Sequence, residues 1–181
     1  MSKGPEKSWL DRLSAFFRRR DEALGHVLEA SGCREGWLHG ELHREFRDVK
    51  GFALNRHLLS DAETADVMVE GAMVGEVKIL GSGYQRKVIT GGSLKPFLGS
   101  ARRLVTPKSV ALNLGPWGLI PDYFRLLHAR VPPHFERLLV LVADVADEDS
   151  DAVAQALRAI EFKGEPRRVE LTRGFVRIWR V

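Results

Sequence analysis

The sequence predicts one α/β domain that follows a helical extension. Short β-branched and apolar runs, at residues 65–80 and 138–143, are typical of strands, whereas residues 8–31 repeat apolar side chains at helical spacing. The 181 residues are enough for one well-cored domain, and no internal repeat or low-complexity tract divides them. We therefore predict a helical extension over residues 1–32 and an α/β domain over residues 33–181.

The composition is that of an ordinary soluble protein with a mild basic bias. The net charge is +4, and no apolar run reaches the roughly 18 residues that a transmembrane helix needs. The polar start of the chain predicts that no signal peptide is present. The single cysteine, Cys33, excludes an intramolecular disulfide and suits a reducing compartment. We therefore expect a cytoplasmic protein with no membrane partner.

Two helical segments come first in the chain. In the first, residues 8–31, Ser8 is the predicted N-cap, and the charged run Arg18–Glu22 is either a solvated helix face or a break between two helices. The second covers residues 35–49, and its apolar stripe consists of Leu38, Leu42, Phe46 and Val49. A connector with a short strand follows at residues 50–64.

The rest of the chain predicts alternating helices and strands. The fully apolar run at residues 138–143 is typical of a central strand, because both of its faces are apolar. We further predict a helix over 93–104, a strand over 109–114, helices over 121–128 and 149–160, and one or two strands over 169–181.

Residues 65–80 predict a hairpin that gathers charge on one face. Gly71 interrupts the β-branched run and marks the turn. If the hairpin is centred there, Asp66 lies opposite Glu76 and on the same face as Lys78, which is roughly 6–7 Å from Glu76 along the strand. Valine and isoleucine side chains form the other face. The sequence thus predicts two carboxylates and one ammonium group side by side.

Because burying charge is costly, this cluster has two possible interpretations. In the first, Lys78 neutralises a carboxylate and the rest of the cluster faces water. In the second, Asp66 and Glu76 bind a hard cation such as Mg²⁺, and Lys78 orients or helps to deprotonate a water molecule.

Acidic residues of the second helix are candidates to join the same cation. Glu41 and Glu45 are four residues apart and lie beside the apolar stripe, although Glu41 is equally placed to pair with Arg44. His39 and His43 have the spacing of zinc ligands. The glutamate between them is one position too late for the zinc-protease motif, so we do not expect zinc.

The order of helix acid, aspartate and Glu-x-Lys resembles the PD-(D/E)xK nuclease superfamily. The resemblance covers residues 35–90 and implies a restriction-endonuclease-like fold, with a mixed central sheet flanked by helices. It implies that Asp66 and Glu76 bind Mg²⁺ or Mn²⁺ and that Lys78 positions the attacking water. The helix glutamate of the family corresponds to either Glu41 or Glu45, and Glu45 is the candidate third ligand. Ala65 replaces the proline of the motif.

The segment after the Glu-x-Lys strand predicts a surface for a polyanion. No Asp or Glu occurs from Val77 to Pro121, so a surface built from this segment carries a positive field, unless carboxylates from elsewhere in the fold answer its charges. The candidate nucleic-acid-binding residues are Gln85, Arg86, Lys87, Lys95, Arg102, Arg103 and Lys108.

The sequence therefore predicts a metal-dependent nuclease that hydrolyses phosphodiester bonds, with DNA as the favoured substrate. The alternative is a non-catalytic module with the same fold, which binds nucleic acid or protein as a subunit of a larger complex. A protein partner or a second copy of the chain is compatible with both functions.

Overall fold

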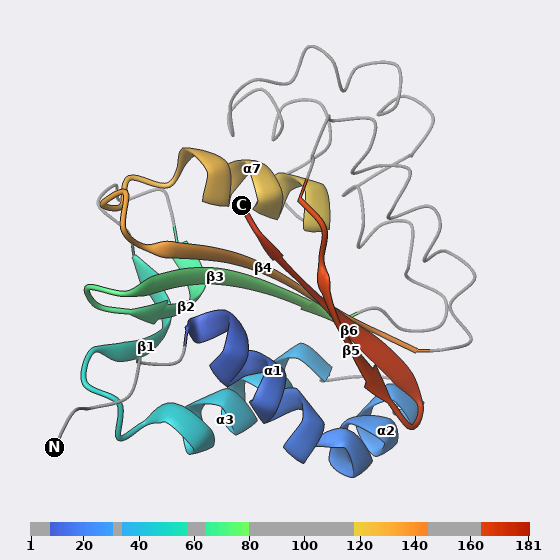
Figure 1. Cartoon of the computed structure of the whole chain (residues 1–181). Coiled ribbons are helices and arrows are strands. Elements are labelled where there is room, and N and C mark those ends of the chain that lie inside the picture. Colours follow the sequence, from blue (N-terminus) through green and yellow to red (C-terminus); the bar gives the residue numbers. More distant parts are fainter. Residues whose placement is uncertain (1–7, 31–33, 58–63, 80–117, 145–163) are drawn as a thin grey trace, which may run out of the picture.

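The computed structural model describes residues 8–30, 34–57, 64–79, 118–144 and 164–181 (Figure 1). Its centre is a mixed six-stranded sheet in the order β1-β2-β3-β4-β6-β5, in which β3 and β4 are parallel and the other neighbours are antiparallel. This confirms the predicted α/β class with a mixed sheet. The strands are β1 (Phe52–His57), β2 (Thr64–Val69), β3 (Met73–Ile79), β4 (Glu136–Ala143), β5 (Arg167–Leu171) and β6 (Gly174–Arg180).

Helices lie on both faces of the sheet. The helices α1 (Trp9–Arg19), α2 (Asp21–Glu29) and α3 (Arg34–Phe46) are on one face, and α7 (Leu119–His128) packs against β3 and β4 on the other (Figure 1). Ser8 is the N-cap of α1, as predicted, and its hydroxyl accepts the amide hydrogen of Asp11 at 3.2 Å. Arg20 ends α1 and begins α2, so the charged run is a break between two helices.

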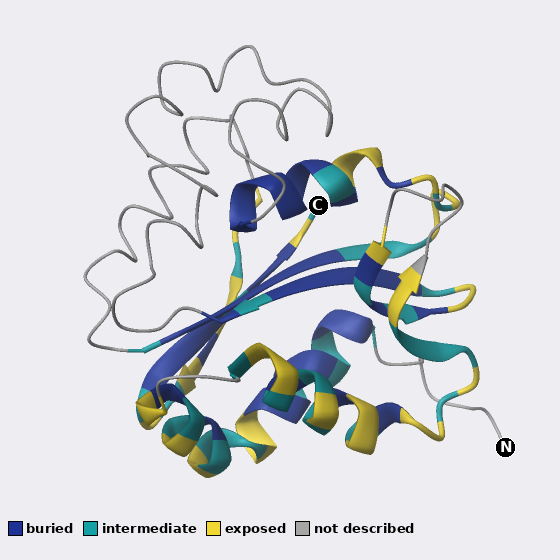
Figure 2. Ribbon diagram, turned by 180° about the vertical axis from the view of Figure 1, so that it is seen from behind, coloured by how far each residue is buried: buried dark blue, intermediate teal, exposed yellow. Residues whose placement is uncertain are grey.

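The main core lies between the sheet and the N-terminal helices. Trp9 of α1 packs edge-to-face on Phe46 of α3 with ring centroids 5.4 Å apart, and Phe16 and Phe17 are fully buried beside them. Figure 2 shows that the middle strands and the inward sides of these helices are buried. The helices predicted as an N-terminal extension therefore share one core with the α/β domain.

The central strand β4 is buried on both faces, as its continuous apolar run predicts. Leu138, Val140 and Val142 belong to the core under the N-terminal helices, and Leu139 and Leu141 are completely buried on the other face. A strand of this kind needs cover from both sides, and α7 supplies the second cover.

The hairpin of β2 and β3 has the predicted register. Gly71 occupies the turn with a φ of 75°, where a side chain would be strained. Val67 pairs with Gly75 and Val69 with Met73, so the hairpin is centred on Gly71. Alternation then assigns Val67, Val69 and Val77 to the core face and the charged residues to the face that α7 covers.

Several predicted features lie outside the described residues. These are Cys33, the helices predicted at 93–104 and 149–160, the strand predicted at 109–114, and the candidate nucleic-acid-binding residues from Gln85 to Lys108. Within the described residues, no helix is both long and apolar enough to cross a membrane.

Candidate functional site

The predicted triad of Asp66, Glu76 and Lys78 is brought together at the β2–β3 strand pair. Lys78 Nζ is 4.0 Å from Asp66 Oδ2. Burial first, and then the carboxylate charges of Asp122 and Asp66, raise the pKa of Glu76, so Asp66 acts on Glu76 across the strand pair. The hairpin register therefore does what the sequence predicts and places all three side chains in one cluster.

A local separation of the two strands gives Asp66 its position. Regular pairing of β2 with β3 covers only the residues from Val67 to Val69. Beyond it, Asp66 Oδ2 accepts the backbone amide hydrogen of Val77 at 2.9 Å, where a strand carbonyl would otherwise be the acceptor. The carboxylate therefore sits at the point where the sheet opens, accessible to side chains from both faces.

Lys78 is held by three carboxylates from three different elements. Its Nζ is 3.1 Å from Asp122 Oδ2 on α7 and 3.3 Å from Glu35 Oε1 on α3, in addition to the longer contact with Asp66. Burial alone lowers the pKa of Lys78, but Asp122, Asp66 and Glu35 outweigh it and hold this pKa above its usual value. Lys78 is therefore a permanent cation and hydrogen-bond donor at physiological pH.

Helix α7 adds two groups that the sequence did not indicate as site residues. Asp122 is completely buried, and Arg125, one turn later, forms ion pairs with Asp122 and with Glu76, whose Oε2 is 3.4 Å from Arg125 Nη2. Burial raises the pKa of Asp122 to about 6, although Lys78 and Arg125 oppose the rise. Burial and the neighbouring carboxylates of Asp122 and Asp66 likewise raise the pKa of Glu76. Thus α7 fixes both members of the Glu-x-Lys pair.

A group suited to a cation forms where α3 meets the open end of β2. Glu35, His39 and Asp66 each offer one ligand atom, and these atoms lie within 4.8 Å of one another. Within the described ranges of the chain, the buried His39 Nε2 has no hydrogen-bond partner. Two carboxylates and an imidazole form a donor set that accepts a divalent cation, so the residues present fit the implied metal.

Glu41 and Glu45, the predicted helix acids, are paired with arginines. Glu41 Oε2 is 2.8 Å from Arg20 Nε and 3.1 Å from Arg44, while Glu45 pairs with Arg19 and Arg20. The structure brings Glu35 to the cluster in their place. Glu41, six residues after Glu35, lies about 120° from it around the helix axis, whereas His39 lies only about 40° from it. The apolar stripe alone did not reveal which side of α3 faces the opening.

This difference predicts that Glu35 and Glu41 respond differently to the same substitution. Glu35→Gln is expected to weaken Mn²⁺ binding about tenfold, because a ligand loses its charge. Glu41→Gln is expected to leave binding within about twofold and to lower the unfolding free energy by about 1 kcal/mol, because it weakens partly exposed ion pairs. Calorimetric Mn²⁺ titration and urea unfolding measure both effects. Equal loss of metal affinity in the two variants would assign Glu41 to the site.

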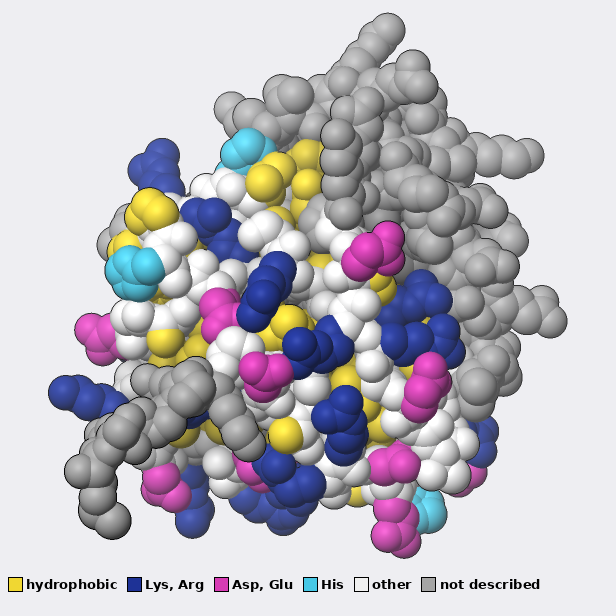
Figure 3. Space-filling model, viewed as in Figure 1, with side chains coloured by type: hydrophobic (Ala, Val, Ile, Leu, Met, Phe, Trp, Pro, Cys, Tyr) yellow, Lys and Arg dark blue, Asp and Glu magenta, His cyan; other side chains and the backbone are white. Residues whose placement is uncertain are grey.

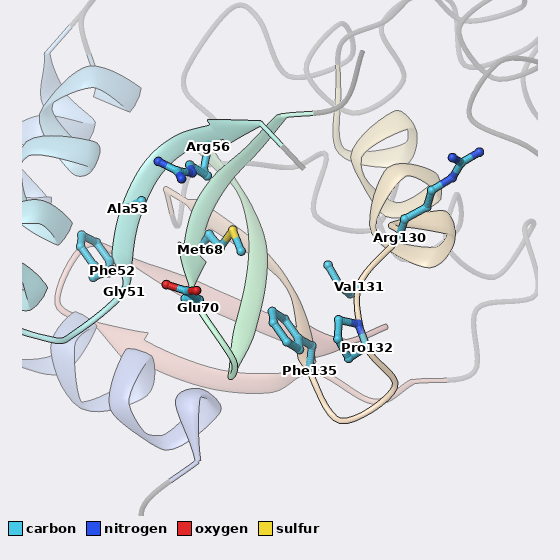
Figure 4. A pocket seen from close by; sticks show the side chains of 10 residues that line it. All are labelled: Gly51, Phe52, Ala53, Arg56, Met68, Glu70, Arg130, Val131, Pro132 and Phe135. Carbon is cyan, nitrogen blue, oxygen red and sulfur yellow. The ribbon is translucent and has the colours of Figure 1, made fainter. Parts of the chain in front are cut away.

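A cavity of about 470 Å³ lies against the face of β2 that also carries Asp66. Met68 forms part of it, and strand alternation places Met68 next to Asp66 on this face. Figure 4 shows Phe135 and Val131 lining its other side, from the connection between α7 and β4. None of the cluster residues is among those that line this cavity.

The predicted basic surface cannot be traced in the described part of the chain. Its candidate residues lie between Gln85 and Lys108, outside the described ranges. On the face shown in Figure 3, Lys and Arg side chains are interspersed with Asp and Glu. The binding of a polyanion by the basic segment remains a prediction.

Comparison of the chain with family models, with curated proteins and with solved structures gave no match. The function of the site is therefore inferred from the chemistry of its described residues. These supply two cations, four carboxyl groups and one imidazole nitrogen that has no partner among them, at an opening in the sheet.

Proposed function

We propose that this protein is a nuclease that uses Mg²⁺ or Mn²⁺ to hydrolyse phosphodiester bonds, with DNA as the favoured substrate. The observation that carries the proposal is the convergence of Asp66, Glu76 and Lys78 with a carboxylate from the preceding helix, Glu35. Helix acid, aspartate and Glu-x-Lys occur in the order found in the PD-(D/E)xK superfamily. The helix acid is Glu35 rather than Glu41 or Glu45.

The charge balance of the cluster supports a divalent cation. Four carboxyl groups, those of Glu35, Asp66, Glu76 and Asp122, face two cations, Lys78 and Arg125. When all are ionised, the cluster carries two excess negative charges in a largely buried setting, which is costly. A divalent cation offsets this excess, and in its absence proton uptake does so, in agreement with the raised pKa values of Glu76 and Asp122.

Each protein group has a distinct task in the proposed reaction. When bound, the cation supplies charge stabilisation at the phosphate and lowers the pKa of a water molecule. Asp66 and Glu35 would hold the ion, whereas Glu76, the other ligand that the resemblance implies, pairs with Arg125 and is not part of the group of Glu35, His39 and Asp66. Lys78, because it stays protonated, donates hydrogen bonds to the attacking water or to a phosphate oxygen and does not act as the base. Asp122 and Arg125 hold Lys78 and Glu76 in place from the other side.

The topology around the cluster also supports this proposal. The helix α3 precedes the antiparallel strands β1, β2 and β3, and α7 lies between β3 and its parallel neighbour β4. The resemblance implies a mixed central sheet flanked by helices, and the sheet of this chain is mixed and has helices on both faces.

One observation favours the non-catalytic alternative. Glu35, Asp66, Glu76 and Asp122 each have a cationic partner within the chain, so the cluster also fastens α3 and α7 to the sheet without any ion. In this reading the protein binds nucleic acid or a protein partner and cuts nothing.

Cleavage of labelled nucleic acids tests the proposal. Single- and double-stranded DNA and RNA are incubated with the full chain in Mg²⁺, Mn²⁺ or EDTA. We expect metal-dependent cutting, reduced at least about 100-fold by Asp66→Ala. The matched control is Asp48→Ala, because the Asp48 side chain is 95% exposed after the end of α3. Binding without cutting, unchanged by Asp66→Ala, would identify the protein as a non-catalytic module.

A further inference from the structure

We propose that His39 binds the cation through its Nε2 atom, and that the group Glu35–His39–Asp66 therefore selects Mn²⁺ over Mg²⁺. The inference concerns the cation site of the proposed function. It is tested on the protein without nucleic acid, so that it can fail or succeed independently of nuclease activity.

The local geometry brings the three ligand atoms toward one point. Glu35 and His39 are four residues apart on α3, and their side chains project from nearly the same side of that helix. Asp66 approaches from β2, where its carboxylate already bonds the Val77 amide. The three ligand atoms lie within 4.8 Å of one another. Three evenly spaced ligands about 2.2 Å from one ion are at most about 3.8 Å apart, so side-chain shifts of about half an ångström complete the site.

The buried nitrogen of His39 is the observation that points to a ligand. Its Nε2 is shielded from solvent and has no hydrogen-bond partner among the residues that the structure describes. A buried polar atom without a partner is destabilising, and such atoms are uncommon in folded proteins. A cation held by Glu35 and Asp66 supplies the missing partner, because a neutral imidazole nitrogen donates its lone pair to a metal.

The imidazole changes which cation the site prefers. Mg²⁺ is a hard cation that favours an all-oxygen octahedron and retains several waters. Mn²⁺ accepts carboxylate oxygens as readily, and it also binds imidazole nitrogen. An all-carboxylate site gives the two ions similar ligands, whereas one nitrogen among three protein ligands favours Mn²⁺. His39 is therefore the residue that sets the preference, and the two carboxylates supply the charge.

Electron paramagnetic resonance of bound Mn²⁺ tests the coordination directly. In the wild-type chain we expect echo modulation from one directly bound ¹⁴N nucleus, and we expect its loss in His39→Gln. The matched control is His43→Gln, the same substitution one turn later on α3, where the side chain is exposed. Its spectrum should retain the nitrogen signal.

Calorimetric titration of the same three proteins tests the selectivity. We expect the wild type and His43→Gln to bind Mn²⁺ at least about tenfold more tightly than Mg²⁺, and His39→Gln to reduce this ratio to about threefold or less. Bound Mn²⁺ without nitrogen modulation in the wild type would overturn the proposal even if His39→Gln failed to fold. Equal wild-type affinities for the two ions would overturn the selectivity. Both of these outcomes concern only His39. A cation held by the two carboxylates alone could still support cleavage of nucleic acid, and the cleavage assay tests that separately.

Discussion

Arg125→Met is expected to lower the unfolding free energy by about 3 kcal/mol at pH 8, because it leaves the buried Glu76 carboxylate without its cation and leaves Asp122 with Lys78 alone. Glu76 is only 2% exposed, and Arg125 pairs with both Glu76 and the fully buried Asp122. The methionine retains most of the apolar stem of the arginine, so packing changes little. The loss of unfolding free energy should therefore come from the missing positive charge of Arg125 and not from a change in side-chain volume.

The same variant should be closer to wild type in acid. Burial raises the pKa of Asp122 from about 3.8 to about 6, and the pKa of Glu76 is also raised. The folded protein thus holds protons that the unfolded chain releases above about pH 4, so stability from these groups falls as the pH rises toward 6. Removing Arg125 raises both pKa values further and extends this fall to higher pH. The deficit of the variant should shrink to about 1 kcal/mol near pH 4.5, where both carboxyls are protonated.

Urea unfolding at the two pH values measures this difference. Arg130→Met is the control, since Arg130 is exposed just beyond the end of α7, and it should change stability by less than about 0.5 kcal/mol. A loss that is equal at pH 8 and pH 4.5 would show that Arg125 contributes packing and not charge compensation.

The hairpin and the central strand are the parts of the fold that the sequence predicts best. Side chains alternate with a period of two, and Gly71 marks the turn, so the neighbourhood of Asp66, Glu76 and Lys78 follows from local pattern alone. The apolar run of β4 likewise requires cover on both faces, and the structure places it in the middle of the sheet. Strand alternation and a continuous apolar run can both be recognised within a few consecutive residues, so no distant contact is needed to predict them.

The remaining site residues depend on contacts between distant segments. The choice between Glu35 and Glu41 depends on how far α3 is rotated about its own axis, and an apolar stripe defines that rotation too coarsely. Asp122 and Arg125 join the cluster because α7 lies across β3 and β4. A helix beginning near Pro121 was predicted, but no local pattern of the sequence indicates which strands it covers.

Lys78→Met is expected to reduce the rate of phosphodiester cleavage at saturating metal by roughly 10²–10³-fold. Removing one donor that stabilises developing charge in an active site has an effect of this size. Metal affinity should not fall, because the substitution removes a cation from beside Asp66 and Glu35 and so reduces electrostatic opposition to a bound ion. If Lys78 acts in the chemical step, Lys78→Met should therefore lower the turnover number and leave the Mn²⁺ dissociation constant unchanged or lower.

Saturating Mn²⁺ also compensates part of the charge that Lys78→Met leaves unbalanced, so the comparison is made on folded protein, as circular dichroism can verify. Lys78→Arg keeps the cation, and it should recover part of the rate.

Because its carboxylate neighbours hold the pKa of Lys78 above the usual value, the wild-type rate should show no loss from deprotonation of this lysine between pH 7 and about 10. Undiminished cutting by Lys78→Met would separate Lys78 from the chemistry. It would leave this lysine only the role of joining α3 and α7 to the sheet.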